Sequence, residues 1–152
     1  MFPCNVIRSN EPLWKHVFCC GVAPHLSVVC LETLRVALRE DDPALIQGAT
    51  SLPVSFEANK NRDVEAACVL GYCGWKGSGL KTVGEVEEFF AQICYDCDQS
   101  IGEPAACRHF LNWFDDTPRD QMRRLLLEEV ESELNRREGK LKANPEKVLS
   151  GN

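Results

Sequence analysis

The chain has 152 residues and a formal net charge of −6 at pH 7. Hydrophobic residues make up 44% of it and charged residues 26%, which is typical of a soluble globular protein and argues against a wholly disordered chain. The acidic balance argues against nucleic-acid binding, because a basic face supplies most of the affinity in that class. We expect no membrane association either, since no stretch approaches the ~20 apolar residues that cross a bilayer.

Residues 1–24 are predicted to form an irregular N-terminal segment that packs on the body of the protein. Its large apolar side chains, Trp14 and Phe18 among them, need a core to pack against. Three prolines interrupt any helix in this part of the chain, because each removes a backbone donor and clashes with the preceding turn. They are Pro3, Pro12 and Pro24.

The next part of the chain predicts two helices, over residues 25–39 and 44–47. In the first, apolar residues recur at steps of three and four, which places them on one helix face. In the second, Asp42 can cap free backbone donors and Pro43 suits the first helical position. Gly48 then ends the short helix.

The middle of the chain predicts a loop followed by a further helix. Residues 49–61 contain at most one short strand, over residues 53–57. Asp63 is then in the position of a helix cap, and residues 64–73 follow as a helix rich in small residues. Strand signals are otherwise nearly absent from the sequence.

The second half predicts three helices, over residues 83–100, 104–114 and 118–137. Thr82 and Glu85 form a capping box, in which each side chain satisfies a free backbone N–H of the other's turn. A proline at the first helical position opens each of the other two helices.

Gly139 is expected to end the last helix, and the polar residues 139–152 are predicted to form a flexible, disordered tail. The sequence therefore predicts an all-α fold, a compact bundle of five or six amphipathic helices. The helical domain itself is predicted to span residues 25–138.

The chain contains nine cysteines, an odd number that makes complete internal pairing impossible. Cys68, Cys94 and Cys97 fall on apolar stripes of predicted helices, where a free cysteine behaves as a small hydrophobic residue. Structural disulfides are rare in the cytosol. We therefore expect reduced thiols and a cytoplasmic protein.

One group of cysteines and a histidine raises the alternative of a zinc-binding helical module. Cys94 and Cys97 have the usual spacing of two zinc ligands, and Cys107 with His109 could complete a tetrahedral shell. On a helix, however, positions 107 and 109 point about 200° apart. Packed cysteines beside a surface histidine remain the other interpretation, so zinc is the one cofactor to test.

The interpretation that we favour is a protein-binding module, adaptor or regulatory, that acts on a protein partner or on a second copy of itself. Phe89, Phe110 and Trp113 are candidates for an exposed apolar patch, which in soluble proteins marks such a contact. Arg119 and Arg123 form the basic cluster that would meet an acidic partner.

A second alternative is an enzyme, or a domain that binds a small ligand in the core of the bundle. Tyr72, Tyr95 and His109 would be the polar contacts of that ligand. No Ser/His/Asp or Cys/His catalytic arrangement can be assembled from the sequence, so we expect no catalytic activity.

Overall fold

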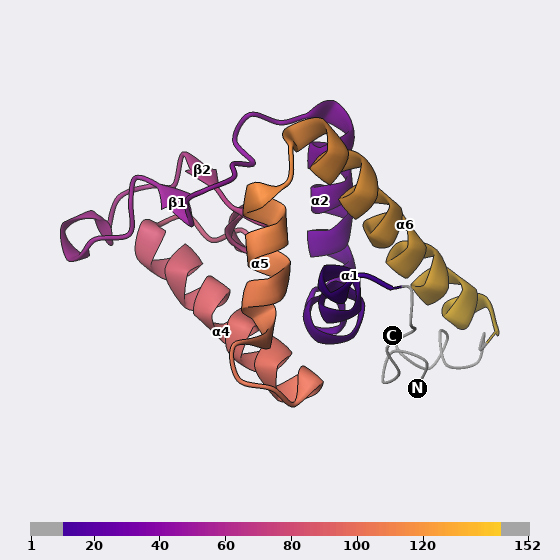
Figure 1. Cartoon of the computed structure of the whole chain (residues 1–152). Helices are drawn as coiled ribbons and strands as arrows, with labels where there is room; N and C mark the ends of the chain where they lie inside the picture. The colour runs from indigo at the N-terminus through magenta and orange to yellow at the C-terminus, as the bar shows by residue number, and fades with distance from the viewer. Residues whose placement is uncertain (1–10, 144–152) are drawn as a thin grey trace.

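The computed structural model describes residues 11–143, and these residues form a compact bundle of helices with one small two-stranded sheet (Figure 1). The all-α fold predicted from the sequence is confirmed. The N-terminal elements are α1 (Leu13–Val17), η2 (Phe18–Val22), η3 (Ala23–His25) and α2 (Val28–Glu40). The middle of the chain holds β1 (Ser51–Leu52), η4 (Glu57–Asn59), β2 (Ala66–Ala67), α3 (Val69–Tyr72) and η5 (Cys73–Gly77). The C-terminal half holds α4 (Val83–Ile101), α5 (Ala106–Asp116) and α6 (Arg119–Ala143).

The helices enclose one hydrophobic core. In Figure 1, α6 runs diagonally beside α2, while α5 lies between α4 and the N-terminal helices. The largest fully buried side chains come from elements far apart in the sequence, which include η2, α2, α5 and α6; among them are Phe18, Leu34, Phe110, Phe114 and Leu126. Among the described residues, no helix is long and apolar enough to cross a membrane.

The local signals at the ends of α4 act as the sequence predicts. Glu85 N donates to Thr82 Oγ1 at 3.3 Å, and Thr82 N donates to Glu85 Oε1 at 3.1 Å, so both halves of the capping box form. Gly102 ends the helix in the left-handed conformation, with φ of 84°. A side chain disfavours that conformation, which explains a glycine there.

The N-terminal segment is helical from Leu13 to His25, not irregular as the sequence predicted. The two prolines at its ends are compatible with helix. Pro12 occupies the cap position, where no backbone donor is needed, and its carbonyl accepts from Lys15 N at 3.1 Å. Pro24 lies in the first turn of η3. Residues 1–10 lie outside the described residues.

Of two helices predicted in the middle of the chain, one does not form and the other loses its first part to strand pairing. Residues 44–47 form no helix, because Asp42 Oδ1 accepts from Ala44 N in a tight turn and Leu45 then pairs with Ala67 as a parallel bridge. The helix predicted over residues 64–73 begins only at Val69, because the preceding residues form β2, whose Ala66–Ala67 pairs antiparallel with Ser51–Leu52.

Helix α6 continues through Gly139 to Ala143, beyond the end predicted at residue 137. A glycine inside an exposed helix costs only about 1 kcal/mol relative to alanine, and lysine and glutamate beside it favour the helix. The predicted flexible tail therefore begins later than residue 139. Its remainder, residues 144–152, lies outside the described residues.

Candidate functional site

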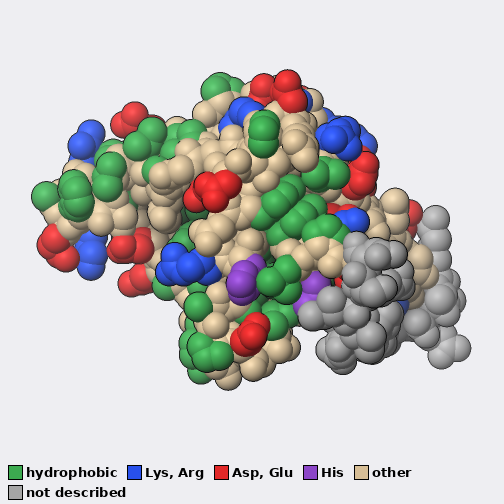
Figure 2. Space-filling model, viewed as in Figure 1, with side chains coloured by type: hydrophobic (Ala, Val, Ile, Leu, Met, Phe, Trp, Pro, Cys, Tyr) green, Lys and Arg blue, Asp and Glu red, His purple; other side chains and the backbone are tan. Residues whose placement is uncertain are grey.

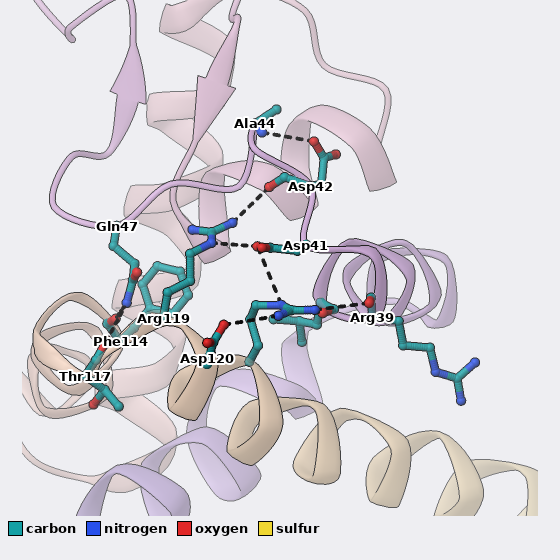
Figure 3. Close-up of polar contacts among 11 residues, drawn as sticks. Arg39, Asp41, Asp42, Ala44, Gln47, Phe114, Thr117, Arg119 and Asp120 are labelled. Carbon is teal, nitrogen blue, oxygen red and sulfur yellow. Dashed lines mark hydrogen bonds and ion pairs between the residues drawn. The ribbon is translucent and has the colours of Figure 1, made fainter.

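The arginines of the predicted basic cluster bind other residues of the same chain, at the place where the end of α2 meets the start of α6 (Figure 3). Arg119 Nε donates to Asp41 Oδ1 at 2.7 Å, and its Nη2 donates to the Asp42 carbonyl at 3.0 Å. The Arg119 guanidinium lowers the pKa of Asp41, and a hydrogen bond from the Tyr72 hydroxyl lowers the pKa of Asp42. Arg119 thus fixes the conformation of the turn that follows α2, because both of its hydrogen bonds go to residues of that turn.

Arg123 completes this junction by capping the C-terminus of α2. Its Nε donates to the Leu38 carbonyl at 2.9 Å and its Nη2 to the Arg39 carbonyl at 3.1 Å. The last carbonyls of a helix have no partner within the helix, so an arginine from another element can satisfy them. Arg119 and Arg123 therefore have a structural role that the partner-binding prediction did not foresee.

The three aromatic residues predicted to form an exposed patch are not gathered on the surface. Phe110 is 0% exposed and packs against Phe18, with ring centroids 5.2 Å apart, so it cannot contact a partner in this structure. Trp113 is half-buried. Phe89 is also half-buried and lies so close to Gly74 that a Cβ there would stand 2.8 Å from its ring.

The cysteines of the predicted metal site do lie together, between α4 and the first turn of α5. Cys94 and Cys107 line one cavity, and Cys107 N donates at 2.9 Å to Asp98 Oδ1, which lies one turn after Cys94. Interactions with the thiols of Cys94 and Cys97, followed by burial, raise the pKa of Cys107. The hydrogen bond from Cys107 lowers the pKa of Cys94, as does the nearby Arg108, against the opposing effects of burial and Asp98.

Local backbone chemistry places this thiol cluster, which we define as Cys94, Cys97 and Cys107. Both oxygens of the Asp98 carboxylate accept backbone N–H groups at the start of α5, from Ala105 at 3.1 Å and from Cys107 at 2.9 Å. A carboxylate at this position also suits the positive end of the helix dipole. Asp98 thus anchors α5 against α4 and brings Cys107 to the other two thiols.

His109 is not part of the thiol cluster. It is exposed, two residues beyond Cys107 on α5. Within residues 11–143, no group of three or more histidine, cysteine, aspartate or glutamate side chains is placed to hold a metal ion. The structure therefore brings together three of the four predicted ligands but does not assemble them with His109.

A cavity of about 330 Å³ opens beside the thiol cluster. Cys94, Cys107 and Arg108 line it together with Asp98. The rest of its wall is formed by Thr50, Phe90, Ala105 and Leu111. A smaller cavity of about 140 Å³ shares Thr50, Phe90 and Leu111 and extends to Asp115. Two of the cysteines thus line a hollow in the surface, and Cys94 is the more exposed of them.

The polar residues predicted to hold a ligand in the core are dispersed. The Tyr72 hydroxyl donates to Asp42 Oδ2 at 2.6 Å, and burial followed by this bond raises the pKa of Tyr72. Tyr95 is exposed on α4, where it lines a shallow hollow near Gly102. Tyr72, Tyr95 and His109 therefore do not line one cavity.

An exposed apolar surface lies instead where sequence reasoning did not place it, on the loop that joins β1 to β2. We call residues 52–62 the arm. Leu52, Val54 and Phe56 are 42%, 47% and 64% exposed, and they are spaced two residues apart in the sequence. Figure 1 shows the arm projecting from the helices at the left, and Figure 2 shows hydrophobic side chains on it beside acidic and basic ones.

The sequence signal that could have revealed this surface is the apolar residue at every second position from Leu52 to Phe56, because a half-exposed strand has a period of two residues. It was insufficient because β1 itself has only two residues, and the rest of the segment has no pairing partner that a sequence pattern could reveal. A comparison of the chain with models of known protein families, with curated proteins and with solved structures finds no match.

Proposed function

We propose that the protein is a helical binding module without catalytic activity, and that it contacts a protein partner through the arm. The observation that carries this proposal is the exposure of Phe56, the most exposed large hydrophobic side chain among the described residues. Interfaces depend on a few apolar or aromatic anchors that enter a pocket on the partner. Apolar side chains that are exposed to water in the free protein, such as those of the arm, can supply these anchors.

The arm is held in shape by hydrogen bonds, which supports its use in recognition. Phe56 N donates to the Val54 carbonyl at 2.8 Å, and the Asn59 side chain donates to the same carbonyl at 2.8 Å. The Ser55 hydroxyl donates to Glu87 on α4. A segment that is ordered before binding loses less conformational entropy when it binds.

The returning half of the arm is bound to the start of α4. Val83 N donates to the Arg62 carbonyl at 2.9 Å, and Gly84 N donates to the Lys60 carbonyl at 2.9 Å. The free N–H groups in the first turn of α4 thereby find acceptors on the arm. These bonds fix the returning half of the arm to the helical body, while Phe56 remains exposed for a partner.

The chemistry of the arm suits a partner with an apolar groove and mixed charge at its rim. Glu57 and Lys60 form an ion pair at 3.4 Å beside the apolar set, so the arm carries both signs of charge. Burial of a phenylalanine side chain contributes about 1.5–3 kcal/mol. Loss of the Phe56 ring should then weaken binding by about ten- to hundred-fold.

Site-specific crosslinking tests the proposal directly. A photo-reactive benzoylphenylalanine replaces Phe56 in one variant and Val29 in the control, in cells that produce the protein. Val29 is 59% exposed on α2, so the two probes have similar access to solvent. We expect a discrete crosslinked protein from position 56 and none of the same mass from position 29.

A titration with the purified crosslinked partner then measures the contribution of the arm. Phe56→Ser should weaken the complex, whereas Val29→Ser should leave its Kd unchanged. If the partner is a second copy, sedimentation velocity of the purified chain should show a dimer that Phe56→Ser dissociates. Equal crosslinks from both positions, or equal affinity of the two variants, would show that the arm is not the contact surface.

A further inference from the structure

We propose that Cys94 and Cys107 form an oxidisable dithiol, in which a hydroperoxide oxidises Cys94 and Cys107 then closes a disulfide between α4 and α5. The proposal begins from geometry. Both thiols line the cavity of about 330 Å³ that opens between the helices, and Asp98, one helical turn after Cys94, accepts from Cys107 N at 2.9 Å. A reactive pair needs both contact between its sulfurs and a route for the oxidant, and the cavity provides that route.

The three thiols of the cluster differ in how far they are exposed to solvent, and this difference assigns them different roles. Cys94 is half-buried, so a small oxidant in the cavity meets it first. Cys107 is 2% exposed and is placed to resolve the oxidised sulfur rather than to meet the oxidant. Cys97 is buried and does not line the cavity.

The charges around Cys94 also support this assignment. A thiolate is the nucleophile in such reactions, and hydrogen-bond donors or cations nearby favour it. The Cys107 thiol and Arg108 both lower the pKa of Cys94, while Asp98 opposes them. The Asp98 carboxylate accepts two backbone N–H groups at the start of α5.

The chemistry balances in two steps. The Cys94 thiolate attacks one oxygen of the hydroperoxide, an S–O bond forms, the O–O bond breaks, and the leaving oxygen takes a proton to give an alcohol or water. The Cys107 thiol loses its proton and attacks the sulfur of the Cys94 sulfenic acid. An S–S bond then forms, the S–O bond breaks, and water leaves with that proton. Two thiols are oxidised by two electrons and one peroxide is reduced.

A second pair of cysteines in the same protein provides an internal control. The Cys30 thiol donates to the Cys73 carbonyl at 3.3 Å, so these two residues are also neighbours. Both are buried, and neither lines a cavity that we describe. Hydrogen bonds, above all that with Cys73, lower the pKa of Cys30 to about 5, so the lack of a route for the oxidant is what should keep this pair reduced while Cys94 reacts.

The test treats reduced full-length protein with tert-butyl hydroperoxide and measures intact mass and disulfide-linked peptides. We expect a loss of two hydrogen masses and a crosslink between the peptides of Cys94 and Cys107. In Cys107→Ser the sulfenic acid should persist at Cys94 and be captured by dimedone. In Cys94→Ser the mass loss should disappear.

Because the variants could alter folding, the peptide map of the unmodified protein is decisive by itself. A Cys30–Cys73 crosslink, or oxidation of Cys94 no faster than that of Cys30, would overturn the proposal. A first crosslink between Cys97 and Cys107 would overturn the role of Cys94. Circular dichroism of each variant identifies any that have lost their helices, and such a variant is replaced by the alanine substitution.

Discussion

The indole ring of Trp14 in α1 stacks on the indole ring of Trp113 in α5, with the ring centroids 3.6 Å apart and the planes inclined by 5°. Trp14 also lies within 6.5 Å of the ring centroid of Phe110. Three aromatic rings thus join the N-terminal segment to the C-terminal half of the chain. The N-terminal helices are therefore part of the core and not an appendage to it.

Trp113→Ala should lower the free energy of unfolding by about 2–4 kcal/mol, because it removes the ring that covers Trp14 and leaves a cavity. Urea denaturation followed by circular dichroism measures this change. Leu13→Ala, in the same helix as Trp14 and exposed to solvent, is the control and should change stability by less than about 1 kcal/mol. Equal effects of the two substitutions would show that the stacked pair contributes nothing specific.

Arg123→Ala should destabilise the protein by about 1–3 kcal/mol, because the Leu38 and Arg39 carbonyls at the end of α2 would lose a charged donor. Arg124 is the matched control, since it is the next residue of α6 and is exposed. Arg124→Ala should leave the urea midpoint almost unchanged. Hydrogen exchange should also quicken at the C-terminal turn of α2 in the Arg123 variant alone.

Two glycine substitutions should have opposite signs. A Cβ at Gly21 would stand 2.5 Å from Cys97 Sγ, so Gly21→Ala should destabilise the protein by about 1–3 kcal/mol. At Gly139 nothing lies within 4 Å, so Gly139→Ala should stabilise α6 by about 0.5–1 kcal/mol. Thermal unfolding of both variants checks the prediction, and a stabilising Gly21→Ala would contradict the close contact of η2 with α4.

Stability should fall in acid through the aspartates at the turn after α2. The Tyr72 hydroxyl lowers the pKa of Asp42 below its unfolded value, and Arg119 does the same for Asp41. Groups of this kind contribute stability that is fully present above the unfolded pKa, about 4, and is lost as the pH falls through the lower folded value.

The measurement is the urea midpoint between about pH 6 and pH 2, with the unmodified protein compared to Asp42→Asn. The variant cannot lose a proton at this position, so its stability should depend less steeply on pH below about 4. Parallel curves for the two proteins would contradict the role of Asp42.

Removal of metal should leave the fold unchanged. His109 lies apart from the thiol cluster, so only three of the four predicted ligands remain. Structural zinc sites ordinarily have four protein ligands. The melting temperature of protein treated with a chelator should therefore equal that of untreated protein. Native mass spectrometry is the second measurement. One zinc ion lost on denaturation, together with a lower melting temperature in chelator, would restore the zinc-binding alternative.

The sequence by itself determined those features that depend on neighbours a few residues away. The capping box of Thr82 and Glu85, the left-handed Gly102 and the amphipathic pattern of α2, α4 and α6 are local, and each is present in the structure. Helical hydrogen bonds join residues four apart, so their signals lie within one turn of the chain.

The tertiary structure decided what depends on residues distant in the sequence. The pairing of Ser51 with Ala67 replaced the first part of the helix predicted over residues 64–73, because strand pairing satisfies backbone groups across a long separation that no local period records. In the same way, only folding brought Arg123 to the end of α2 and Cys107 to Cys94. The arm is exposed for the same reason, since no other element of the described chain packs over Phe56, and burial is a property of the whole fold.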